Sequence, residues 1–185
     1  MAQTTENPKY KLLAQYGDIE IRSYQPMIQA VVHTSTGNGF RPLAAYIFGG
    51  NETGESIAMT APVATRKSTQ GYATAFMMPA KYSLDDLPTP ENEQVELLQV
   101  PARVMAVITF SGWANRDAVN HHNSELLVFV EERGWSVIGE PVINQYNDPW
   151  TAAEQRTNEV QYQLKDYATV AQPEDFDSKP SVTLH

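Results

Sequence analysis

Residues 37–63 read GNGFRPLAAYIFGGNETGESIAMTAPV, and they predict a short helix followed by a strand. Asn38 is a candidate N-cap for this helix, because its side-chain oxygen can accept a hydrogen bond from a backbone N–H group of the first turn. Gly49 and Gly50 supply the left-handed backbone conformation that ends it. Apolar side chains recur at helical spacing between these ends and give the helix a wide apolar face. This pattern is typical of a helix that covers a sheet.

The rest of the chain predicts strands and one further helix. The expected strands span residues 10–16, 19–24, 27–36, 57–66, 72–78, 95–100, 103–110, 136–138, 141–146 and 159–164. Pro62 cannot donate a ladder hydrogen bond, so its strand is expected at an edge or a bulge of the sheet. The second helix is expected to begin after Asn115, a good N-cap, and to end at about Arg133, before Gly134.

The order of these elements indicates one domain built from two similar halves. Residues from about 19 to 79 and from about 95 to 164 each contain strands, then a helix that ends at glycine, then more strands. A proline-rich connector at residues 84–90 lies between them. We therefore predict an α+β fold, in which two pseudo-repeated halves form a distorted antiparallel β-barrel flanked by two helices. Residues 1–164 would form this domain, and residues 165–185 would be a polar tail with little structure of its own.

Composition and charge disfavour several classes of partner. The chain has 185 residues, a formal net charge of −9 and no cysteine. An acidic surface does not favour nucleic acid or anionic membranes, because phosphates attract basic side chains. Without cysteine there is no disulfide, thiolate nucleophile or thiolate metal site. No apolar run is long enough for membrane insertion, and the first residues lack the pattern of a signal peptide. A cytoplasmic monomer is expected, and an exported form whose signal has been removed stays open.

Few side chains form a pattern that is associated with catalysis or metal binding. No phosphate-binding loop, dinucleotide fingerprint or Gly-x-Ser-x-Gly elbow occurs, so binding is favoured over catalysis. His33, in a β-branched strand, is a candidate axial ligand for a haem iron. His121 and His122 are adjacent on a helix and would point about 100° apart, so we expect no shared metal site. Glu159, at the start of the last strand, is a candidate general base or a partner for a basic ligand group.

Seven ordered blocks of the sequence resemble the SOUL haem-binding protein family. The blocks are Tyr46–Asn51, Ile57–Val63, Phe76–Pro79, Val100–Arg103, Phe110–Gly112, Tyr146–Trp150 and Arg156–Val160. The resemblance covers the chain from about Tyr16 to Leu164. It implies a distorted antiparallel β-barrel flanked by two helices, similar to the ligand-binding module of the GyrI type. This fold agrees with the architecture predicted above.

The resemblance also implies binding of haem or another tetrapyrrole, by a protein that carries or buffers it. The porphyrin would lie in a groove between the first helix and the loop before the last strand. The apolar positions of this groove fall on Phe40, Leu43 and Ala44. Two basic positions, one on the helix and one on the loop, fall on Ala45 and Ala152, so both basic groups are missing in this chain.

Three further side chains are candidates for contacts with this ligand. Arg41, one turn before Ala45, and Arg156 could replace the missing basic groups and bind the propionates. Trp150 lies on a loop without an obvious place in a core, so it is a candidate lip of the groove.

Two other functions stay open at this point. The chain could be a small-molecule binder or a hydrolase of the GyrI type, which would use Glu159 with a tyrosine such as Tyr46. In that case, both groups should face one pocket. Alternatively, the groove could hold a segment of a protein partner.

Overall fold

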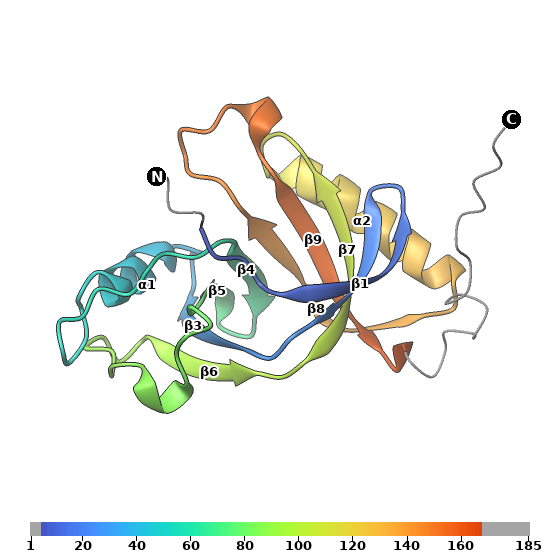
Figure 1. Cartoon of the computed structure of the whole chain (residues 1–185). Helices are drawn as coiled ribbons and strands as arrows, with labels where there is room; N and C mark the ends of the chain where they lie inside the picture. Colours follow the sequence, from blue (N-terminus) through green and yellow to red (C-terminus); the bar gives the residue numbers. More distant parts are fainter. Residues whose placement is uncertain (1–4, 168–185) are drawn as a thin grey trace, which may run out of the picture.

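The computed structural model describes residues 5–167, which form one sheet and two α-helices (Figure 1). The strands are β1 (Tyr10–Tyr16), β2 (Ile19–Tyr24), β3 (Met27–Thr34), β4 (Val63–Ser68), β5 (Gly71–Met77), β6 (Glu96–Val100), β7 (Arg103–Phe110), β8 (Ser136–Gln145) and β9 (Asn158–Lys165). The helices are α1 (Phe40–Ile47) and α2 (Arg116–Glu132), with short 3₁₀ turns η1 (Leu84–Asp86) and η2 (Ala153–Gln155). In this part of the chain, no helix is long and apolar enough to cross a membrane.

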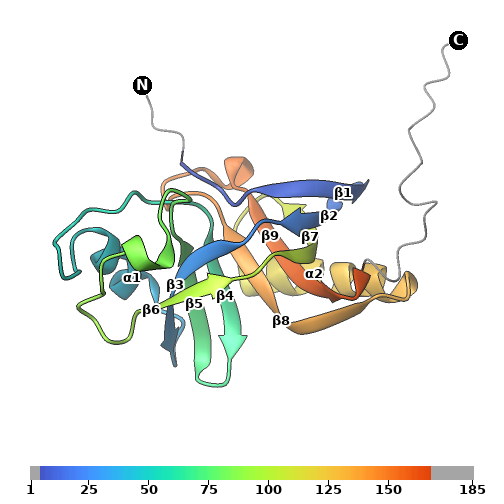
Figure 2. The ribbon, with the colours of Figure 1, turned by 60° about the horizontal axis from the view of Figure 1, so that its bottom comes forward.

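All nine strands pair antiparallel in the order β1-β2-β7-β9-β8-β4-β5-β3-β6. β1 and β6 are the two edges, and within residues 5–167 they do not pair with each other. The sheet is therefore open, and the predicted closure into a barrel is not found. Only Pro101 and Ala102 join β6, at one edge, to β7, near the other. Because this connection is so short, the sheet must curl back on itself (Figure 2).

The two predicted halves exchange strands across their boundary. β2 lies between β1 and β7, so residues 19–24 pair with the second half of the chain instead of the first. β6 pairs with β3, so residues 96–100 pair with the first half. The connector at residues 84–90 therefore does not separate two independent parts of the sheet.

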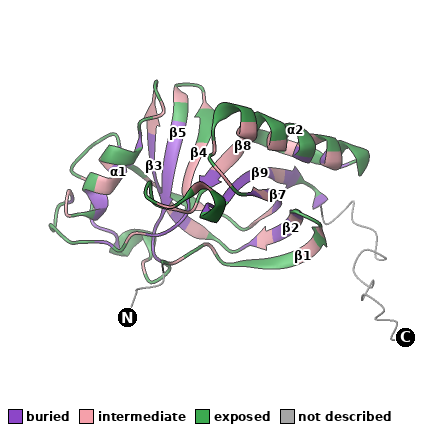
Figure 3. Cartoon of the chain, turned by 90° about the horizontal axis from the view of Figure 1, so that it is seen from above, coloured by how far each residue is buried: buried purple, intermediate pink, exposed green. Residues whose placement is uncertain are grey.

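The helices cover one face of the sheet and bury two separate apolar clusters. α1 packs on β3 and β5, where Leu43, Ile47 and Phe76 are buried. α2 packs on β7, β8 and β9, where Leu126 and Val130 are buried. Figure 3 shows this division, with exposed residues on the outer side of α2 and buried residues along the strands. The opposite face of the sheet has no helix over it within the described residues.

Local sequence explains most boundaries, with one exception at α1. As predicted, the Asn115 side chain accepts a hydrogen bond of 2.9 Å from the first turn of α2, and Gly134, with φ +71°, follows the helix. The cap predicted for α1 is wrong, because its N-cap is Gly39 and no side chain caps it. A Cβ atom at Gly39 would lie 2.6 Å from the Thr74 side chain. Packing against β5 therefore requires glycine at this position.

Two strand predictions also need correction. The strand predicted from residue 57 begins only at Val63, because Pro62 has no N–H group for a ladder and the residues before it form an isolated bridge with Glu6. The two short strands predicted between residues 136 and 146 form the single strand β8. Its pairing with β9 is interrupted by an irregularity between Ile138 and Val142.

The predicted tail begins later than expected. Lys165 still belongs to β9, and Tyr167 is buried against Trp135 at a ring distance of 5.1 Å. The prediction of little structure is therefore wrong for residues 165–167, since Lys165 belongs to a strand and Tyr167 belongs to the apolar cluster beneath α2. Residues 168–185, for which the same prediction was made, lie outside the described residues.

Candidate functional site

The uncovered face of the sheet, which we call the inner face, carries polar side chains at its centre. Strand register places Glu159 of β9 beside Asn144 of β8 and places Gln161 beside Val142. Six polar residues of this face form what we call the polar centre, namely Arg22, Tyr24, Asn144, Tyr146, Glu159 and Gln161. The inner face also includes Ala64, Arg66, Ala73, Ala75, Arg103, Met105 and Val142, which are discussed below. Five residues of the polar centre are buried, and Tyr146 is partly buried, so the polar centre lies inside the curled sheet.

Glu159 is the hub of this polar centre and is only 3% exposed. The Arg22 guanidinium donates to Glu159 Oε1 at 2.7 Å. The Tyr146 hydroxyl and the Gln161 amide donate to Oε2 at 2.8 Å each, and the Asn144 amide donates at 3.4 Å. Both carboxylate oxygens therefore have donors, and β2, β8 and β9 are joined through one acidic group.

Arg22 balances the charge of Glu159 and is itself shared. Its Nε donates to Glu20 at 2.6 Å, and its Nη1 donates to the Tyr24 hydroxyl at 3.0 Å. Burial alone would lower the pKa of Arg22, but the negative charge of Glu159 and the contacts with Tyr24 raise it above its usual value. Burial also raises the pKa of Tyr146, and Glu159 raises it further. Tyr146 is therefore a neutral hydrogen-bond donor at neutral pH.

A cleft of about 590 Å³ opens beside this cluster and is lined by Arg22, Tyr146 and Glu159. Glu159 and a tyrosine thus line one cleft, but this tyrosine is not Tyr46, the residue named in the GyrI-type alternative. The Tyr46 hydroxyl donates to the Pro88 carbonyl at 2.9 Å within the α1 cluster. The structure brings Tyr146 to Glu159 because β8 and β9 are neighbours.

Residues 5–9 lie beside the clefts of the inner face, and the sequence analysis did not predict this. The Glu6 carbonyl accepts from the Ala61 N–H group at 3.0 Å, and the Glu6 carboxylate accepts from the Ala80 N–H group at 3.0 Å. Pro8 lines both the cleft beside Glu159 and a smaller hollow over Gln161. Residues 5–9 therefore form part of the wall of the inner face, although their sequence has no strong pattern.

The residues of the predicted α1 groove differ in accessibility. Leu43 is completely buried in the α1 cluster, whereas Phe40 is 48% exposed and meets the Phe76 ring at 5.3 Å. Arg41 and Ala45 are exposed, and Ala44 is partly buried. Phe40 and Arg41 can therefore contact a ligand from solvent, but Leu43 supports the helix from below.

The loop between β8 and β9 has two very different candidates. Trp150 is 90% exposed, so it is available as the predicted lip. Arg156 is buried and donates to the carbonyl oxygens of Asp148 at 2.9 Å and Thr151 at 3.1 Å. Its guanidinium also lies 4.0 Å from the centre of the Trp113 ring. These contacts give Arg156 a role in holding the loop, which competes with its predicted contact to a propionate.

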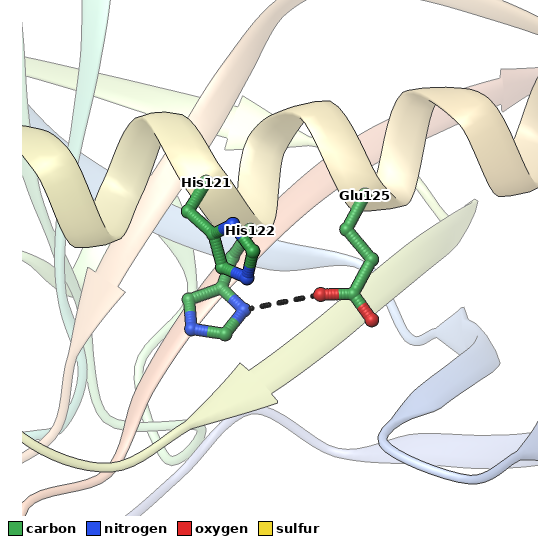
Figure 4. A group of neighbouring side chains, drawn as sticks. All are labelled: His121, His122 and Glu125. Atoms are coloured by element: carbon green, nitrogen blue, oxygen red, sulfur yellow. Dashed lines mark ion pairs between the residues drawn. The ribbon is translucent and has the colours of Figure 1, made fainter.

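Within the described residues, His33, His121 and His122 make no hydrogen bond or ion pair with the polar centre. His33 Nδ1 is 3.3 Å from the Ser68 hydroxyl, and axial ligation by His33 stays a prediction. His121 and His122 do come together, since one ligand atom from each and one from Glu125 lie within 4.8 Å of one another (Figure 4). The expectation that adjacent histidines point too far apart is therefore wrong. Side-chain rotation brings the rings edge to face at 5.0 Å, and Glu125 is 3.4 Å from His122.

The described residues thus form an α+β fold, whose inner face has clefts of the size that small molecules occupy. The chain belongs to the SOUL heme-binding protein family, whose family model matches residues 5–163. This match confirms the resemblance that was drawn from the seven sequence blocks. A search of the curated proteins found no match.

Solved structures with a similar fold include an uncharacterized conserved protein from Listeria innocua, with a TM-score of 0.63, 12% identity, and coverage of 82% of this chain and 94% of that chain. The C-terminal domain of EcmrR has a TM-score of 0.59 and 12% identity, with 84% of this chain and 98% of that chain covered. A hydrolase from Listeria innocua has a TM-score of 0.58 and 13% identity, with 82% and 94% covered. These identities are low, so the similarity concerns the fold alone.

Proposed function

We propose that this protein binds haem or a related tetrapyrrole without covalent attachment and acts as a carrier or buffer. The observation that carries the proposal is its membership in the SOUL heme-binding protein family over residues 5–163. The predicted site is the groove between α1 and the loop before β9. The exposed rings of Phe40 and Trp150 would hold the porphyrin face, and Arg41 would bind a propionate.

Titration with haemin tests this proposal directly. The purified protein should shift the Soret band of haemin at micromolar concentrations, and the change should saturate at one haem per chain. Protoporphyrin IX, titrated in parallel by fluorescence, reports whether the iron is needed. A Soret band that stays at the position of free haemin across this range would rule out the proposed function.

Restoring the two missing basic groups gives a sharper test of the site. Ala45 and Ala152 are both exposed, so lysine is accommodated at either position. Each of Ala45→Lys and Ala152→Lys should tighten haemin binding about three- to tenfold, because an ammonium group gains a charge-assisted contact with a propionate. Val128→Lys, on the exposed side of α2, adds the same charge elsewhere and should leave the dissociation constant unchanged. If all three variants bound haemin more tightly by the same factor, the gain would come from net charge and not from a contact at the predicted groove.

A second candidate function, a small-molecule binder of the GyrI type, is favoured by one observation. Glu159 and Tyr146 line the same cleft of about 590 Å³, which is within the ordinary size of ligand sites. Binding is favoured over hydrolysis here. Both oxygens of Glu159 already accept hydrogen bonds, and the raised pKa of Tyr146 keeps its hydroxyl protonated.

The hydrolysis of p-nitrophenyl acetate separates the binder from the hydrolase. We expect the wild-type protein to release p-nitrophenol no faster than the Tyr146→Phe variant, whose missing hydroxyl removes one donor to Glu159. A general acid or base in the cleft would instead make the wild type about 100-fold faster or more. Such a difference, measured at equal folded fraction by circular dichroism, would establish the hydrolase.

A further inference from the structure

A second cleft of the inner face, with a volume of about 400 Å³, lies at the other end of the curled sheet. Side chains of β6 and of β8 both line it, although these strands are far apart in the strand order. Its lining includes the small side chains of Ala64, Ala73 and Ala75 and the apolar side chains of Met105 and Val142. Ala64 of β4 pairs directly with Ala75 of β5, and Ala73 lies two residues before Ala75 on the same face, so the three side chains form a small apolar floor.

Arg103, at the start of β7, has an unusual position in this cleft. Its Nη1 atom is buried and has no hydrogen-bond partner in the described chain. Residues 5–167 also offer it no carboxylate within ion-pair distance, although the protein has 22 acidic residues in all. A guanidinium stays charged in proteins, and burying an unpaired charge is costly. This unsatisfied donor therefore has no structural role that hydrogen bonding can explain.

Arg66 of β4 adds a second positive charge to the same cleft. It is exposed, lines the cleft, and makes no ion pair within the described residues. Burial lowers the pKa of Arg103, Tyr24 opposes this change, and the positive charge of Arg66 lowers the pKa again. Glu140 also lines the cleft, but it is exposed and is not paired with either arginine. An anion bound in this cleft would therefore meet two positively charged side chains.

We propose that this cleft binds an organic carboxylate with a flat apolar body. The carboxylate would accept hydrogen bonds from Arg103 and an ion pair from Arg66, and the flat body would lie on the floor formed by Ala64, Ala73 and Ala75. The buried Nη1 atom of Arg103 would then have an acceptor. This site does not depend on tetrapyrrole binding at α1.

The planar carboxylate 2-naphthoate, with its neutral isostere 2-naphthamide, is the matched probe for this site. Isothermal titration calorimetry on the whole chain should give a 2-naphthoate dissociation constant at least about tenfold lower than that of 2-naphthamide, because only the carboxylate pairs with the arginines. Raising the salt concentration should reduce this ratio. Equal binding of the two probes, or binding of neither, would overturn the proposal. Neither result affects the haemin experiment.

Three variants assign the interaction to particular residues. Arg103→Met should weaken 2-naphthoate about tenfold or more and leave 2-naphthamide unchanged, and Arg66→Met should weaken 2-naphthoate by a smaller factor because Arg66 is exposed. Lys11→Met removes the same charge from the exposed edge strand β1, outside the cleft, and should have no effect.

The stability of Arg103→Met separates a ligand role from a structural role. Methionine removes a partly buried guanidinium that forms no ion pair within residues 5–167, so the variant should unfold at the same urea concentration as the wild type or a higher one. A destabilised Arg103→Met variant that still binds 2-naphthoate with wild-type affinity would overturn the proposal. If Arg103→Met does not fold, the ratio between the two probes on the wild-type protein still decides the question.

Discussion

Replacing Glu159 by leucine is expected to lower the free energy of unfolding by about 3 kcal/mol, because it leaves the buried Arg22 guanidinium without its main partner. Glu20 keeps one contact with Arg22 at 2.6 Å, which limits the loss. The donors of Tyr146 and Gln161 would also lose their shared acceptor. Urea unfolding followed by circular dichroism measures the change, and the melting temperature should fall by roughly 6–12 °C.

The double variant Arg22→Met with Glu159→Leu provides the control for this prediction. Removing both members of a buried ion pair avoids the uncompensated charge, so the double variant should recover most of the lost stability. A double variant that is less stable than Glu159→Leu alone would show that packing, and not charge compensation, governs this cluster.

Substituting Leu43 by alanine should reduce the free energy of unfolding by about 2–5 kcal/mol. Leu43 is completely buried between α1 and the sheet, so truncation leaves a cavity in the α1 cluster beside Ile47 and Phe76. The same measurement, urea unfolding, applies here. The variant also tests the predicted groove, because a buried Leu43 affects haem affinity only through the position of α1.

Phe48→Ala, at the C-terminal end of α1, is the matched control. Phe48 directly follows α1 and is 68% exposed, so the loss of its ring should change stability by about 0.5 kcal/mol or less. If Leu43→Ala were as mild as Phe48→Ala, Leu43 would have to face solvent, and its original assignment to the ligand face of the helix would be restored.

The secondary structure was largely predictable because its signals are local. β7 spans Arg103–Phe110 as predicted, and α2 begins after Asn115 and is followed by Gly134. A capping side chain, a glycine in the left-handed region and a run of β-branched residues each act over a few positions. Where a more distant element intervenes, the prediction fails. Gly39 at the start of α1 is required by Thr74 of another element, and the sequence near α1 carries no sign of it.

The polar centre of the inner face was only half predictable. Glu159 was identified as a candidate general base or ligand contact, but Tyr46 was named as its partner, and Arg22 was not connected with it. Arg22 and Glu159 are 137 residues apart in the chain. Only the pairing of β2 with β7, and of β7 with β9, brings them together. Nothing in the sequence alone selects Arg22 and Tyr146, out of all arginines and tyrosines, as the partners of Glu159.

The sequence by itself determined the family of this protein, since seven short blocks in a fixed order are enough to identify it without coordinates. It also determined most strands and both helices, because the spacing of apolar residues and the presence of turn residues can be recognised within a short stretch of sequence. The tertiary structure decided that Tyr146 meets Glu159, that Leu43 is buried and that the Nη1 atom of Arg103 has no partner among residues 5–167. These facts depend on which strands are neighbours and which face each residue occupies. A single chain can satisfy the same local pattern with many strand orders, and only packing of the whole sheet selects one.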